Sequence, residues 1–150
     1  MSKNVQKIGV IFGLVVTFGG FLTLLMTWKN IGFTDGFIGA WLSSFALCVL
    51  CIAPIGGVIA FIINRLVNLI FPSLSSVKKN IVFGLVMAVM MESIMAVVTT
   101  INLHGFMMIK EFVDFWLATF VSALPAGLAI SVLMSLVIKP KLAAFWAKPA

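Results

Sequence analysis

One carboxyl group stands out in a chain with few ionisable side chains. Glu92 lies near the middle of the apolar segment 81–103. Insertion scales assign roughly 2.5 to 3.5 kcal/mol to an ionised side chain at the centre of a membrane helix, and no lysine or arginine lies at that depth. We expect Glu92, with Ser93 beside it, either to bind a proton or cation during transport, or to be a protonated acid that hydrogen-bonds a neighbouring hydroxyl or carbonyl group.

A pair of cysteines and a row of methionines have spacings that suggest redox or metal chemistry, but packing is the favoured interpretation of both. Cys48 and Cys51 have the spacing of a redox motif, but they fall inside an apolar stretch, so we expect them to pack as small apolar groups. Met87, Met91 and Met95 recur every four residues and could line a path for copper(I). Methionine also fills irregular packing gaps, which is the favoured interpretation. We predict no metal site and no cofactor.

No set of residues predicts catalysis. His104 is the only histidine, and no Ser or Cys nucleophile is expected near it. The sequence has no glycine-rich phosphate loop with its lysine. His104, Glu111 and Asp114 share a predicted outer loop, where scattered polar residues are expected without any ligand. The protein is predicted not to be an enzyme.

The composition defines the elements that must carry these residues. The chain is 63% hydrophobic and 9% charged, with a mean hydropathy of +1.25, which is outside the range of soluble domains. A helix needs roughly 20 apolar residues to cross a bilayer core. Four stretches meet this length: 8–28, 37–63, 81–103 and 115–138. Because lipid offers backbone groups no hydrogen-bond partners, we predict an all-α integral membrane protein with a four-helix transmembrane bundle.

Basic residues predict the orientation of this bundle. Lys29 and Lys110 lie on one side, whereas most basic residues lie on the side of the termini and the central loop. Basic flanks stay cytoplasmic during insertion, so both termini are expected in the cytoplasm, at a bacterial inner membrane. The net charge of +6 favours contact with anionic lipids, and nucleic acid is not an expected partner. The inner basic residues are Lys3, Lys7, Arg65, Lys78, Lys79, Lys139, Lys141 and Lys148.

The two ends of the chain need separate interpretation. The first apolar stretch follows Lys3 and Lys7 as in a secretion signal, but it is too long and has no cleavage pattern, so we expect a retained helix. The segment 139–150 combines lysines, prolines and aromatic residues. This composition is typical of a short basic anchor at the membrane surface.

Small residues and prolines predict how the helices pack. Small side chains at four-residue spacing let helix backbones approach closely, either within the bundle or across a homodimer. Pro54 and Pro125 lie inside the second and fourth stretches and predict helix kinks, which could mark a binding site. The predicted packing residues are Gly9, Gly13 and Thr17 in the first stretch, and Gly84, Ala88 and Ala96, together with Glu92, in the third.

The two halves of the chain resemble each other. A shift of 83 − 12 = 71 positions aligns Phe12-Gly13-Leu14-Val15 with Phe83-Gly84-Leu85-Val86, and Pro54-x-Gly56 with Pro125-x-Gly127. Each half contains two predicted helices and would insert with the same orientation. We therefore predict two parallel helical-hairpin repeats, residues 1–72 and 73–150, related by a pseudo-twofold axis along the membrane normal.

Further segments of both halves follow a family pattern. They are Thr100-Ile101-Asn102-Leu103, Phe115-Trp116-Leu117, Gly39-Ala40-Trp41-Leu42 and Arg65-Leu66-Val67. With these and the repeated motifs, the chain resembles bacterial membrane proteins of the domain of unknown function 2798, as two tandem copies. It departs from that family at Glu92, where a small hydroxyl residue is usual, and the first copy lacks the Ile-Asn-Leu segment. The resemblance implies a membrane location and no established activity.

Two functions remain open from the sequence. The first is a non-enzymatic membrane protein that acts through helix packing, with membrane lipids, a second copy or another membrane protein as partners. The second is a small proton-coupled exporter or permease in which Glu92 exchanges a proton for a cationic or amphipathic compound. A polar cavity beside Glu92 would favour the transporter, and a tightly packed, dry Glu92 would favour the packing function.

Overall fold

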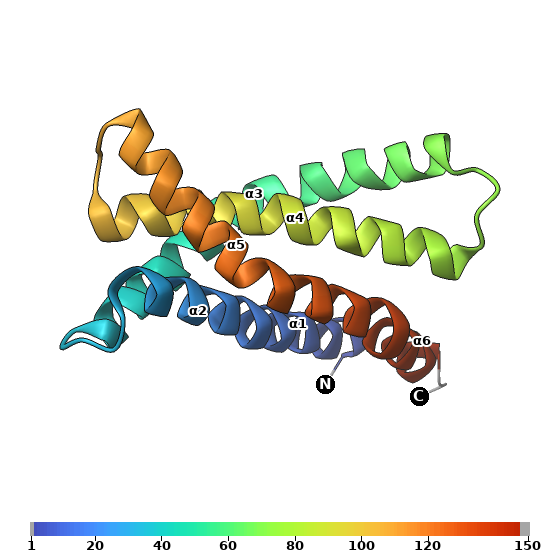
Figure 1. Cartoon of the computed structure of the whole chain (residues 1–150). Coiled ribbons are helices and arrows are strands. Elements are labelled where there is room, and N and C mark those ends of the chain that lie inside the picture. The colour runs from blue at the N-terminus through green and yellow to red at the C-terminus, as the bar shows by residue number, and fades with distance from the viewer. Residues whose placement is uncertain (1, 148–150) are drawn as a thin grey trace.

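The computed structural model describes residues 2–147, and all regular elements in that range are helical (Figure 1). The first and last helices each contain a short π-helical segment, labelled η, without a break in the chain direction. The elements are α1 Lys3–Leu14, η1 Val15–Gly19, α2 Gly20–Ile31, α3 Phe37–Ile70, α4 Ser76–His104, α5 Ile109–Leu133, η2 Met134–Ile138 and α6 Lys139–Ala147.

Within the described range, four continuous helices are long and apolar enough to cross a membrane: Lys3–Ile31, Phe37–Ile70, Ser76–His104 and Ile109–Ala147. They confirm the four predicted spans and indicate a multi-pass membrane protein. Each helix is longer than its apolar stretch, because polar flanking residues continue the backbone hydrogen bonding beyond the hydrocarbon core. The described part of the predicted anchor at 139–150 is α6, which continues the fourth helix, and Lys148 lies outside the described residues.

Glycines end two of the helices in the same way. Gly32 and Gly105 have φ angles of 62° and 72°, which favour glycine, and each backbone N–H donates to the carbonyl four residues earlier at 2.8 Å. The connections 32–36 and 105–108 that follow lie at one end of the molecule. The central connection 71–75 and both termini lie at the other end (Figure 1). The predicted boundary between residues 72 and 73 falls in this central connection, and the repeat itself stays a prediction.

The four membrane helices form a ring, and two opposite helices, α2 and α4, also touch across its centre. Helix α2 packs against α3, α4 and α5, and α4 packs against α3 and α5. The first long helix and α4 are therefore central, with α3 and α5 beside them. Short polar hydrogen bonds and small side chains, rather than a large apolar core, occupy these contacts. This arrangement is expected where lipid removes the hydrophobic force between helices.

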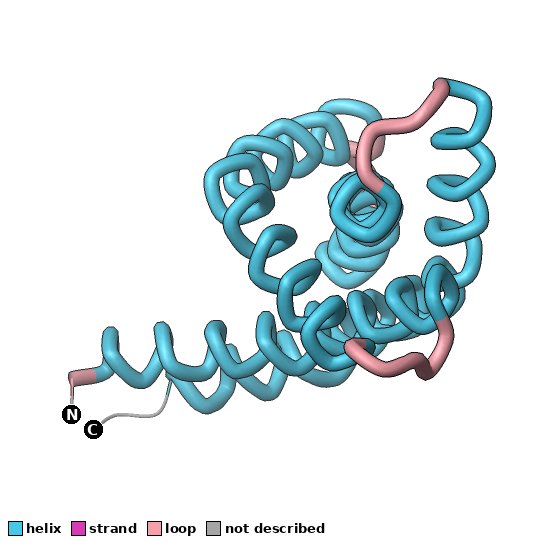
Figure 2. Tube along the Cα trace, turned by 90° about the vertical axis from the view of Figure 1, so that its left-hand side faces the viewer, coloured by secondary structure: helices cyan, strands magenta, loops and turns pink. Residues whose placement is uncertain are grey.

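The two ends of the bundle differ in packing. The half toward the connections 32–36 and 105–108, called the closed half, holds most of the fully buried side chains. The half toward the termini and the connection 71–75, called the open half, contains α1 and α6, which bury no residue. Figure 2 shows the helices that lead to the termini projecting side by side from the bundle. A cavity of about 670 Å³, lined by apolar residues such as Ile8 and Leu50, lies between α1 and α3.

The predicted kink positions lie inside unbroken helices. Pro54 falls within α3 and Pro125 within α5, and both helices continue across them. The interruptions of α-helical geometry are instead η1 and η2, which sequence analysis did not predict. A kink at either proline stays a prediction.

Candidate functional site

Glu92 is enclosed at the contact between α4 and α5. Its side chain is 1% exposed, and neither carboxyl oxygen has a hydrogen-bond partner among the described residues. It faces Gly127 so closely that a Cβ atom at residue 127 would overlap the carboxyl group. The hydrogen bond that the sequence suggested for a protonated Glu92 is not formed. Ser93 instead presents its backbone carbonyl to Trp116 Nε1, at 3.0 Å.

A row of small residues on α5 makes this contact possible. On α4, the predicted packing residues Gly84 and Ala96 lie at this contact, and Ala88 is half-buried between them. A Cβ atom at Gly84 would lie 2.9 Å from Ser135 Oγ. This row was not predicted, although its four-residue spacing in the sequence was a visible signal. The row consists of Thr119, Ala123, Gly127 and Ser131 of α5 and continues at Ser135 of η2, all buried.

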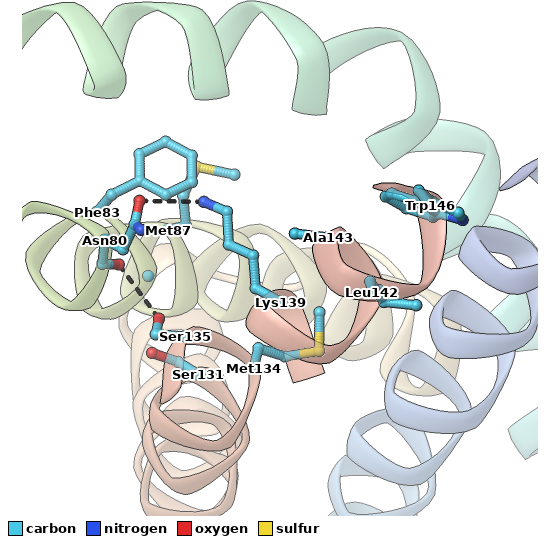
Figure 3. Close-up of a pocket in the computed structure, with 11 residues that line it drawn as sticks. Asn80, Phe83, Met87, Ser131, Met134, Ser135, Lys139, Leu142, Ala143 and Trp146 are labelled. Atoms are coloured by element: carbon cyan, nitrogen blue, oxygen red, sulfur yellow. Dashed lines mark hydrogen bonds between the residues drawn. The ribbon is translucent and has the colours of Figure 1, made fainter. Parts of the chain in front are cut away.

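A cavity of about 550 Å³ opens in the open half, between α4, η2 and α6 (Figure 3). Its wall is mainly apolar and includes Phe83, Met87, Met134 and Leu142. Ser131 also lines the cavity, four residues beyond Gly127 along α5. The cavity therefore ends about one helical turn from the Glu92 contact.

The polar groups of this cavity come from α4, η2 and α6, and from Ser131 of α5. Lys139 Nζ donates a hydrogen bond of 3.1 Å to Asn80 Oδ1 and lies 5.8 Å from the centre of the Phe83 ring (Figure 3). Ser135 Oγ donates to the Asn80 carbonyl at 3.2 Å. Among residues 2–147, the buried Nε1 of Trp146 has no acceptor and no acidic residue lines the cavity. The cavity therefore combines an apolar interior with a positive charge.

Toward the closed half, apolar residues cover the contact between Glu92 and Gly127. Met26, Cys48, Met95, Ala96 and Ala123 form a buried core cluster. Cys48 packs within this apolar cluster, as predicted, and its thiol donates to the Met95 carbonyl oxygen at 3.8 Å. This cluster separates Glu92 from the polar residues nearer the connections 32–36 and 105–108.

Those polar residues form a hydrogen-bonded layer that sequence analysis did not predict. Asn30 Nδ2 donates to Thr119 Oγ1 at 2.7 Å, and Asn30 Oδ1 lies 2.9 Å from His104 Nε2. The His104 ring stacks on Phe115 with centroids 4.2 Å apart. Asn102 Nδ2 donates to Ser43 and Ser44 hydroxyls, each at 2.9 Å. The layer joins all four membrane helices. In residues 2–147, no group of three or more His, Cys, Asp or Glu side chains is placed to hold a metal ion.

The predicted packing face of the first helix is exposed. Gly9, Gly13 and Thr17 are all accessible, and a Cβ atom at either glycine would meet no atom within 4 Å. The Thr17 hydroxyl donates to the Gly13 carbonyl of its own helix at 2.7 Å. The expected contact of this face within the chain is therefore absent, because α1 diverges from α3 and α4 in the open half. Contact with a second copy stays a prediction.

Comparison with known proteins matches part of the chain to a family model. Residues 5–71 match the family model described as "Domain of unknown function (DUF2798)". No curated protein and no solved structure matches the chain. The matched range begins in α1 and ends just after α3, so it covers the first of the two predicted copies. The match supports the resemblance to this family of unknown function for the first two membrane helices.

Proposed function

We propose that the chain is a non-enzymatic membrane protein that acts by binding a second copy of itself within the bilayer. The observation that carries this proposal is the exposed face of Gly9, Gly13 and Thr17. Small-residue faces drive helix association in lipid because they permit close backbone contact. Gly84, which the 71-residue shift aligns with Gly13, is closed over by Ser131 and Ser135. The corresponding face of the first helix has no such cover.

Single-cysteine cross-linking tests the dimer. In a background with Cys48→Ala and Cys51→Ala, Gly13→Cys and Thr17→Cys are compared with Ile11→Cys, which is also exposed on α1 but lines the cavity beside α3. We expect cross-linked dimer at positions 13 and 17 and only background at position 11. Equal cross-linking at all three positions, or at none, would contradict the proposal.

Matched features of the two halves support the parallel repeat. The indole N–H groups of Trp41 and Trp116 each donate to a backbone carbonyl of the preceding membrane helix, at 2.9 and 3.0 Å. Gly32 and Gly105 cap the first helix of each half with similar backbone angles. Exchange of the two halves converts the contact of α2 with α3 into that of α4 with α5, and the contact of α3 with α4 into that of α5 with α2. All four contacts are present. A pseudo-twofold axis between α2 and α4 relates these helix contacts, whereas the 71-residue shift aligns Trp41 with Phe112 and Gly32 with Leu103, so the tryptophan and glycine pairs correspond only in their approximate positions.

We propose that the termini and the connection 71–75 face the cytoplasm, because the basic residues gather at that end. Labelling of intact cells with a membrane-impermeant thiol reagent tests this, in the same cysteine-free background. Thr34→Cys, in an outer connection, is expected to react, and Ser73→Cys, in the central connection, is expected to react only after lysis. The reverse pattern would overturn the orientation.

Proton-coupled export of cationic or amphipathic compounds is the second candidate. A buried carboxyl group without a partner, one helical turn from a cavity, favours it. The tight Gly127 contact of Glu92 and its 1% exposure favour the packing function, which is why export ranks second. Export is tested by Glu92→Gln, with and without a proton gradient, against Glu111→Gln as a control outside the bundle contact. Unchanged efflux of a panel of cationic and amphipathic compounds in Glu92→Gln would exclude the exporter.

A further inference from the structure

We propose that the cavity between α4, η2 and α6 binds one anionic phospholipid, with an acyl chain in the cavity and the phosphate at Lys139. This proposal is independent of the dimer and of transport by Glu92. It rests on the lining of the cavity, on its charge and on its position at the edge of the bundle.

The interior of the cavity suits an acyl chain. Its volume of about 550 Å³ lies within the usual range of ligand pockets, roughly 300 to 1,000 Å³. Phe83, Met87, Met134 and Leu142 give it an apolar wall (Figure 3). The methionine side chains can adapt to a flexible chain because they are unbranched and polarizable. Water would find few hydrogen-bond partners in such a space.

The polar groups select the charge of the lipid. The Lys139 ammonium group has three N–H donors, and the bond to Asn80 Oδ1 goes to a neutral amide, so its charge is not compensated there. Among the described residues, no Asp or Glu lines the cavity. A phosphate group would supply the negative charge that Lys139 lacks there.

The deep end of the cavity offers one more donor. Ser131 is 8% exposed, and its buried hydroxyl has no partner among the described residues. Lys139 lies eight residues further along the chain, at the outer end of the cavity, so the Ser131 hydroxyl would face the acyl chain and not the headgroup. The selection of an anionic phospholipid therefore rests on Lys139 and on the apolar wall of the cavity.

The position of the cavity gives lipid direct access. Lys139 and Ala143 line it and are exposed at the molecular surface. In a membrane, this surface faces the bilayer and its headgroup layer. Lysine-lined pockets between membrane helices are a known type of site for anionic headgroups. The bilayer is thus the source of the ligand.

Native mass spectrometry of the full chain, released from bilayers of equal phosphatidylglycerol and phosphatidylcholine, tests the proposal. The wild-type protein is expected to retain one phosphatidylglycerol molecule in preference to phosphatidylcholine. Lys139→Gln is expected to lower this preference about fivefold, the effect of one lysine near an anionic surface. Lys141→Gln is the matched control, because Lys141 is an exposed lysine on the same helix that does not line the cavity. Its preference should stay within twofold of wild type.

A filling variant separates the acyl-chain site from the headgroup contact. Ala143→Phe adds volume inside the cavity without changing its charge, and it should reduce retention of both lipids. No lipid preference in the wild-type protein, or equal losses in Lys139→Gln and Lys141→Gln, would overturn the proposal. Displacement of phosphatidylglycerol by an equimolar single-chain fatty acid would also overturn it, since the ligand would then be a free carboxylate.

Discussion

The closed and open halves of the bundle differ in how many of their polar side chains have hydrogen-bond partners. In the closed half, Asn30, Asn102 and His104 find partners on neighbouring helices at 2.7 to 2.9 Å. In the open half, the Ser131 hydroxyl and Trp146 Nε1 lack partners and line a cavity. The closed half thus joins its helices through side-chain hydrogen bonds, although its buried Thr100 hydroxyl has no partner among the described residues, whereas the open half leaves polar groups beside a cavity. Glu92 lies where the two halves meet.

The largest expected effect comes from the contact at that boundary. Gly127→Val places a side chain where the Glu92 carboxyl group lies, so that the buried Glu92 side chain must turn away or α4 and α5 must separate. We expect a loss of about 1 to 3 kcal/mol in the free energy of unfolding, the usual cost of overpacking. Gly57→Val is the control, because Gly57 is an exposed glycine of α3 with no atom within 4 Å of its Cβ position. Titration with a denaturing detergent, followed by circular dichroism, measures both.

A double variant tests whether the Glu92 carboxyl group causes the loss of stability in Gly127→Val. Adding Glu92→Ala to Gly127→Val removes the carboxyl group that the valine meets. The double variant is expected to recover most of the lost stability, since the two changes affect the same contact. Additive losses would show that Glu92 does not limit the approach of α4 and α5 at residue 127.

The next effect tests whether the polar layer holds the closed half together. Asn30→Ala removes the bonds to Thr119 and His104 and leaves their polar atoms with fewer partners. Interhelical hydrogen bonds in membranes contribute about 0.6 kcal/mol on average and up to about 1.7 kcal/mol, so we expect a loss in that range. Asn68→Ala is the control, because Asn68 donates only to the Asn64 carbonyl of its own helix. Equal losses in both variants would mean that the layer adds no stability between helices.

The number of helices could be predicted from the sequence because it depends on composition alone. Each apolar stretch is long enough to cross the bilayer whatever its neighbours are, and the structure confirms all four. The burial of Glu92 and the close approach at Gly84 also followed from local signals, namely depth and four-residue spacing.

The partners of these residues could not be predicted in the same way. Contact between Glu92 and Gly127 depends on the rotation and crossing of α4 and α5, which composition does not determine. The exposed face at Gly13 and the buried face at Gly84 have the same sequence pattern, Phe-Gly-Leu-Val, and differ only in whether a neighbouring helix reaches them. The cavity also depends on α6 continuing the fourth helix, whereas the sequence favoured a separate surface anchor.

The smallest expected effect on stability tests the open half. Gly13→Leu adds a side chain to an exposed position of α1, where a Cβ atom meets nothing within 4 Å. Leucine has a higher helix propensity than glycine, so the free energy of unfolding should stay constant or rise by no more than about 1 kcal/mol. The same change should abolish the cross-link at Thr17→Cys, because a large side chain separates two small-residue faces. A stable Gly13→Leu protein that still cross-links at residue 17 would show that the cross-link does not depend on close packing of two small-residue faces.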